Sequence, residues 1–130
     1  MFTINQIKEI HSKVKSGADF PQYIQNLIVL GLTSYEHYVC DGHTKYVGKD
    51  NFQIESEAKY GLLAIAEEGN VEKLKYALKI HQAGETDYLT FCKQSAEAGV
   101  EKWKVDMLEM TCIYYDKQDI TMVIEKIPSV

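Results

Sequence analysis

The chain has 130 residues, a net charge of −5, 45% hydrophobic and 25% charged residues, which is the size and composition of one globular domain. All 14 basic residues are lysine, so the guanidinium fork that binds phosphate and guanine is missing, and we expect no nucleic-acid partner. No apolar run approaches the length of a membrane span, no secretory signal is visible, and three cysteines cannot all pair, so we expect a cytoplasmic protein without membrane contact.

Two helices are predicted at the start of the chain. Thr3-Ile4-Asn5-Gln6 is typical of a capping box, and Gly17 is the expected stop of the helix that it opens. Asp19 is expected to cap a second helix, which tolerates Pro21 in its first turn and ends at Gly31. The apolar spacing along both helices predicts that one stripe of each is buried.

A β-meander is predicted after this helix pair. Alternating residues favour strands over Tyr35–Cys40 and His43–Val47, joined by Asp41-Gly42 as a type I′ turn. A third strand is predicted over Asn51–Glu55. Segment 60–66 is apolar enough for a strand or a helix, and a strand is the interpretation that we prefer.

The second half of the chain predicts the same order of elements. Asn70 is expected to cap a helix that stops at Gly84, and Thr86 or Asp87 to cap another that closes at Gly99. Three strands are then predicted over Trp103–Leu108, Thr111–Tyr115 and Asp119–Glu125.

The two halves match without a gap when Gly31 is aligned with Gly99. In this alignment Tyr35 falls on Trp103, and the agreement of residue class extends over 36 positions. We therefore predict a single α+β domain, 1–130, made by internal duplication of a helix–helix–β-meander unit, with repeats of roughly 1–56 and 60–126. The expected architecture has about six antiparallel strands and four helices.

The alignment of the halves also predicts which strand positions face the core. In the second half, apolar residues at odd positions from Trp103 alternate with charged residues, so the odd positions point inward. The same parity in the first half turns Tyr35 and His37 inward. A ligand pocket is favoured at a seam between two such halves. Its candidate ligand-binding residues are Tyr35, His37, Tyr46, Trp103 and Tyr114.

A metal site is a weaker interpretation of the sequence. His37, Cys40 and His43 lie within seven residues, and the spacing of Cys40 and His43 resembles that of metal ligands. Strand parity sends His37 and Cys40 to opposite faces, however, and no second ligand pair completes the set. We expect no metal and no cofactor.

An enzyme is the alternative to a binding protein. Asp41 with His43, or His81 with Asp87, would supply proton-transfer groups, and Cys92 would supply a thiol. Each has a structural explanation as well, since Asp41 suits a turn, Asp87 a helix cap, and Cys92 a buried helix stripe. These explanations favour a non-enzymatic protein.

Several runs resemble a known family. They are DFPQYIQNL, CDGHTKY, KYALKIHQAGETDYLTFC, EKWKVDMLEMTCIYYDK and IEKIP. Across residues 2–128 the chain is similar to the YdfO/YbcV-like family of prophage-borne proteins (domain of unknown function 1398), some of them labelled phage envelope protein. The resemblance implies an α+β fold and a bacterial or phage origin, and it brings no activity or catalytic residues.

The sequence thus favours a small bacterial or prophage-derived binding or interaction protein. Its partner would be a small molecule at the seam or another protein. A homodimer through the outer face of the second meander is a further expectation, because bulky side chains alternate on both faces there.

Overall fold

In the computed structural model, which describes residues 1–15 and 17–128, four α-helices accompany one six-stranded antiparallel sheet. The strand order is β3-β2-β1-β4-β5-β6, so the first strands of the two meanders meet at its centre. The expected α+β class is confirmed. The elements are α1 (Ile4–His11), η1 (Gly17–Asp19), α2 (Phe20–Leu30), β1 (Leu32–Tyr38), β2 (Thr44–Gly48), η2 (Lys49–Asn51), β3 (Gln53–Glu55), α3 (Val71–Gln82), α4 (Tyr88–Glu97), β4 (Lys102–Asp106), β5 (Thr111–Tyr115) and β6 (Thr121–Lys126).

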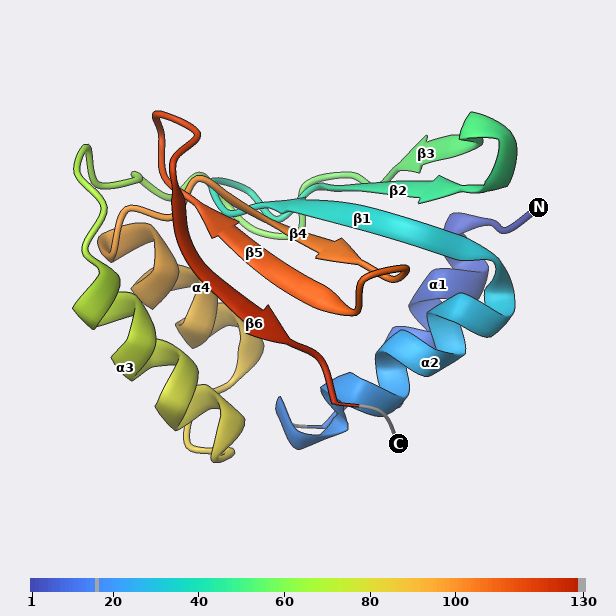
Figure 1. The fold of residues 1–130 in the computed structure, drawn as a ribbon, viewed down its shortest axis with the longest axis horizontal. Coiled ribbons are helices and arrows are strands. Elements are labelled where there is room, and N and C mark those ends of the chain that lie inside the picture. Colours follow the sequence, from blue (N-terminus) through green and yellow to red (C-terminus); the bar gives the residue numbers. More distant parts are fainter. Residues whose placement is uncertain (16, 129–130) are drawn as a thin grey trace.

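The helices pack in two pairs against the same face of the sheet. Figure 1 shows α1 and α2 beneath one end of the sheet and α3 and α4 beneath the other. The opposite face carries cross-strand pairs of opposite charge, such as Glu36 with Lys104 and Lys45 with Glu55, as suits a solvated face. None of the helices in the described residues combines the length and apolar character that crossing a bilayer requires.

The first helix starts as predicted but ends earlier. Thr3 forms the capping box with Gln6, whereas the helix ends at His11 and not at Gly17. The glycine has a different role, because a β-carbon at Gly17 would lie 2.7 Å from the carbonyl oxygen of His81. Gly17 therefore allows the first helical pair to touch the end of α3.

The predicted hairpin is present, but its turn is longer than a type I′ turn. The backbone N–H of Tyr38 donates to the carbonyl of His43 (3.0 Å), which leaves a four-residue loop over 39–42. Within this loop only Gly42 has a positive φ, of 78°, whereas a type I′ turn requires two such residues. The first strand also begins at Leu32, before the predicted start.

The predicted strand over 60–66 is wrong, because this segment forms no ladder with a neighbouring strand. Its backbone N–H groups are satisfied elsewhere. That of Leu63 donates to the carbonyl of Cys40 (2.7 Å), and that of Ala66 to the carbonyl of Ala96 (3.0 Å). The segment is an extended connection between the two halves of the fold.

The hydrogen-bond register of the two hairpins follows the same alignment of the halves as the sequence. Helices α2 and α4 start at Phe20 and Tyr88, which are matched positions in that alignment. A glycine of positive φ follows each helix, Gly31 (117°) at the C-cap of α2 and Gly99 (84°) one residue after the C-cap of α4. The geometry thus agrees with the alignment, while descent from a duplicated segment stays a prediction. The matching pairs are Tyr35–Tyr46 with Trp103–Tyr114, and His37–Thr44 with Val105–Cys112.

The inward parity that the alignment predicts is confirmed. Tyr35 and His37 in β1 are 5% and 3% exposed, and Trp103 and Val105 in β4 are 7% and 0% exposed. These side chains form the floor on which both helical pairs rest. The centre of that floor lies between the pairs, where the pocket is found.

Candidate functional site

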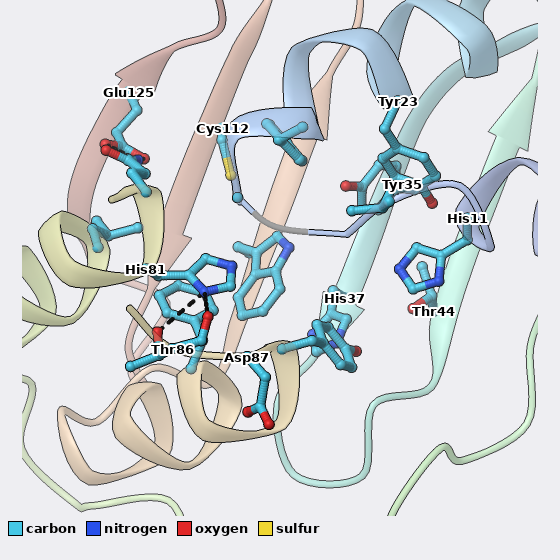
Figure 2. Close-up of a pocket in the computed structure, with 18 of the residues that line it drawn as sticks. His11, Tyr23, Tyr35, His37, Thr44, His81, Thr86, Asp87, Cys112 and Glu125 are labelled. Carbon is cyan, nitrogen blue, oxygen red and sulfur yellow. Dashed lines mark hydrogen bonds between the residues drawn. The ribbon is translucent and has the colours of Figure 1, made fainter. Parts of the chain in front are cut away.

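A cavity of about 370 Å³ lies between the centre of the sheet and the two helical pairs. Its walls come from both halves, as the close-up in Figure 2 shows. The structure brings all five predicted ligand-binding residues together on the lining of this cavity. They are Tyr35, His37, Tyr46, Trp103 and Tyr114.

Aromatic rings form most of the floor of the pocket. Tyr35 and Tyr46 lie 5.8 Å apart between ring centroids, and Trp103 lies at the same 5.8 Å from Tyr114. Phe91 of α4 packs 5.4 Å from Trp103. Such rings offer a large apolar surface to a ligand at little cost in side-chain entropy, because they are already held by one another.

His37 is the polar side chain at the centre of this floor. Its ring stacks on Trp103 with centroids 4.0 Å apart and planes within 1°, and its Nε2 atom is hydrogen-bonded to the hydroxyl of Tyr88. The Nδ1 atom is buried and has no partner among the described residues. Burial, with a smaller effect from Lys59, lowers the pKa of His37 to about 3, so the ring is neutral at neutral pH.

Tyrosine hydroxyls supply hydrogen-bond donors inside the pocket. Burial raises the pKa values of Tyr23, Tyr35 and Tyr114 above their ordinary value of 10.0, so these phenols stay protonated. Within the described part of the chain, the hydroxyls of Tyr23 and Tyr35 form no hydrogen bond at all. Figure 2 places these two side chains next to each other on one wall.

The rim of the pocket carries charges of both signs. Lys59 lines the pocket beside His11. Burial is the main cause of the lowered pKa of His11, and the charge of Lys59 lowers it further. On the opposite side, the carboxylate of Glu125 accepts hydrogen bonds from the Gln82 amide at 3.1 and 3.3 Å. Asp87 is the cap of α4, where its carboxylate accepts from the backbone N–H of Thr90 at 2.8 Å.

The predicted metal ligands are not brought together. His37 lies in the pocket, whereas His43 stacks on Tyr38, with centroids 4.4 Å apart, towards the opposite face of the sheet. Cys40 lies in the hairpin loop between them. Within residues 1–15 and 17–128, no three His, Cys, Asp or Glu side chains are grouped closely enough to hold a metal ion.

The four residues of the enzyme alternative lie at three separate places. Asp41 accepts a hydrogen bond from the backbone N–H of His43 (2.9 Å) and pairs with its ring (2.5 Å), which holds the hairpin loop. His81 lines the pocket, with Nδ1 3.1 Å from the carbonyl oxygen of Thr86. Cys92 is fully buried in α4, and burial raises the pKa of its thiol. The geometry does not join these groups into one site.

A cysteine also lines the pocket. Cys112 lies on β5 beside Tyr114, and its side chain is 3% exposed. Burial raises the pKa of its thiol to about 12, so it is a neutral and weakly nucleophilic group at neutral pH. It adds apolar surface to the pocket.

Sequence reasoning missed the residues that the helices and the connecting segment contribute to the lining. Tyr23 and Phe91 were identifiable only as members of buried stripes, which does not separate a core residue from a pocket residue. Lys59 gave no signal, because it follows the last strand of the first half in a segment without regular structure. These residues meet the predicted ones only through tertiary packing.

The family and the relative that match this chain have no assigned activity. A family described as "Protein of unknown function (DUF1398)" matches residues 8–126. The chain is also 21% identical over 120 residues to the uncharacterized protein YcgX of Escherichia coli (strain K12). That alignment covers 92% of this chain and 90% of the relative.

Proposed function

The chain belongs to this family of unknown function, and we propose that it is a non-enzymatic protein that binds a small molecule in the pocket at the seam between its halves. The observation that carries the proposal is the cavity of about 370 Å³, lined by aromatic rings from both halves. Ligand pockets are typically concave, largely apolar and provided with a few fixed polar groups, which is the composition found here. We place this binding protein in the cytoplasm of a bacterium, with a prophage as its origin.

The protonation states in the pocket favour binding over catalysis. The imidazole of His37, the thiol of Cys112 and the phenol of Tyr35 are all held in their neutral forms by burial. A nucleophile would need an ionised group or an adjacent base, and a general acid or base would need a pKa near neutrality. Neutral donors and aromatic surface suit recognition instead.

Trp103 provides a direct reporter for this proposal. It is the single tryptophan of the chain and it lines the pocket, so a bound ligand will change its fluorescence. We expect a screen of small aromatic metabolites to give compounds that both alter Trp103 emission and raise the melting temperature, as binding to the folded state requires.

A variant that fills the pocket provides the decisive comparison. Val14 is half-buried on the pocket lining, and Val14→Phe places a ring in the cavity. Val29→Phe makes the same change on α2, where the valine is 87% exposed. Binding should be lost in Val14→Phe and kept in Val29→Phe. A screen without hits, or equal binding by both variants, would contradict the proposal.

A further inference from the structure

The first-half end of the pocket is electropositive, although the whole chain has a net charge of −5. Lys59 and His11 line this end, and the charge of Lys59 contributes to the lowered pKa values of both His11 and His37. Burial lowers the pKa of Lys59, and the charge of the nearby Lys8 lowers it further. Cations that disfavour one another's charge in this way indicate a local excess of positive potential.

No carboxylate of the described residues neutralises this end. The ion pairs of the described residues join His43 to Asp41, Lys102 to Glu36 and Asp119, and Lys117 to Glu67, and none includes Lys59. Among the described residues, two carboxylates line the pocket, and both have other partners. Glu125 accepts hydrogen bonds from Gln82, and Asp87 accepts one from the first turn of α4.

The unpaired hydroxyls lie towards the same end. The ring of His11 contacts that of Tyr23 edge to face, with centroids 5.4 Å apart, and Tyr23 adjoins Tyr35 (Figure 2). Each hydroxyl has one proton to donate and no acceptor among the described residues. Neither hydroxyl is among the fully buried side-chain atoms of the described residues that lack a partner, so both are open to the pocket, where an anionic acceptor forms the strongest hydrogen bond with such a donor.

We infer, building on the proposed function, that the ligand is a carboxylic acid with an aromatic or similarly bulky apolar body. Its carboxylate lies near Lys59 and accepts hydrogen bonds from Tyr23 and Tyr35. Its apolar body extends over Trp103 towards Tyr114 and Cys112 in the second half. This orientation gives an acceptor to the hydroxyls of Tyr23 and Tyr35 and packs the ring against other rings.

Three probes with one body and three head groups test the inference. They are 4-phenylbutyrate, 4-phenylbutanamide and 4-phenylbutylamine, which present an anion, a neutral amide and a cation. Their binding is measured by Trp103 emission, excited where the phenyl ring does not absorb, and by calorimetry. We expect the carboxylate to bind about tenfold more tightly than the amide, and the amine to bind more weakly still.

Two variants locate this preference within the pocket. Lys59→Gln should reduce the affinity for the carboxylate about tenfold and leave that for the amide unchanged. Lys104→Gln, which removes a charge from the open face of the sheet, is the matched control and should change neither affinity. Tyr23→Phe keeps the ring and removes one donor, so it should weaken carboxylate binding by a smaller factor, and it remains informative if Lys59→Gln fails to fold.

The outcomes separate the ligand class from the pocket itself. Equal or tighter binding of the amide or the amine overturns the inference and leaves the pocket function in place. Failure of all three probes, when the metabolite screen does give ligands that Val14→Phe loses, also overturns the ligand class alone. Failure of the probes and of the screen together overturns the pocket function as well.

Discussion

The two halves of the pocket floor have the same shape but a different polarity. At one pair of aligned positions both halves carry aromatic rings, Tyr35 and Tyr46 in the first half and Trp103 and Tyr114 in the second. At the neighbouring pair the first half has a histidine and a threonine, whereas the second half has a valine and a cysteine. These pairs are His37–Thr44 and Val105–Cys112.

A framework with two similar halves thus provides a pocket whose two ends differ chemically. The shared aromatic positions fix the width of the pocket, because each ring packs on its cross-strand partner. His37 and Thr44, together with Lys59 from the connecting segment, are contributed by the first half and the segment after it, whereas the negatively charged Glu125 lines the opposite side. A ligand with one anionic end and one apolar end fits such a site in a single orientation.

Removal of the aromatic framework should destabilise the protein most. The ring of Trp103 contacts those of His37, Phe91 and Tyr114, whereas the ring of Tyr35 contacts that of Tyr46. Trp103→Ala should therefore cost about 3–5 kcal/mol of unfolding free energy, and Tyr35→Ala less. Urea denaturation followed by circular dichroism measures both. An equal or larger loss of unfolding free energy in Tyr35→Ala would contradict the larger contribution of Trp103 to stability.

The polar difference between the halves should appear as a dependence of stability on pH. His37 has an ordinary pKa of 6.5 in the unfolded chain and about 3 in the fold, so below pH 6.5 the unfolded chain binds a proton that the folded chain does not. Stability should thus fall as pH decreases from 6.5 towards 3, by about 2 kcal/mol at pH 5.

The variant His37→Phe keeps a ring against Trp103 and removes the titrating group. Its unfolding free energy, measured between pH 7 and pH 5, should lack this component, because the variant differs from the wild type in this one ionisable group. Parallel pH profiles for the wild type and the variant would contradict the buried, neutral histidine.

The smallest effect is expected from Thr44, the polar partner of His37. Its hydroxyl donates to the carbonyl of Gly42 at 3.3 Å and is fully buried. Thr44→Val makes this position as apolar as Cys112, its counterpart in the second half, and should cost about 1 kcal/mol or less, the value of one neutral hydrogen bond. Thermal unfolding is sensitive enough to measure it, and a stabilised variant would contradict the role of this bond.

The parts of the site that the sequence predicts are those governed by strand alternation. Side chains alternate between the two faces of a strand, so the inward orientation of Trp103 predicts that of its neighbours on the same strand. The alignment of the two halves then predicts the inward orientation of Tyr35 and His37. Helix caps at Thr3 and Asp87 are predictable for a similar reason, because the cap is a local hydrogen bond.

The parts that escape prediction depend on contacts between distant segments. Gly17 serves a close approach to His81, and segment 60–66 donates its N–H groups to a loop and a helix end, so neither follows from local pattern. The hairpin loop is longer than its Asp-Gly pair suggests, because His43 pairs with Tyr38 across it. The positive end of the pocket is likewise invisible until Lys59 is placed in space.

The most direct test of the pocket is a titration of labelled protein with 4-phenylbutyrate, followed by nuclear magnetic resonance of the aromatic side chains. The indole signal of Trp103 and the ring signals of Tyr35 and Tyr114 should shift together and saturate with one dissociation constant, because one ligand contacts both halves. Shifts confined to exposed rings such as Tyr76, with Trp103 unchanged, would contradict the account.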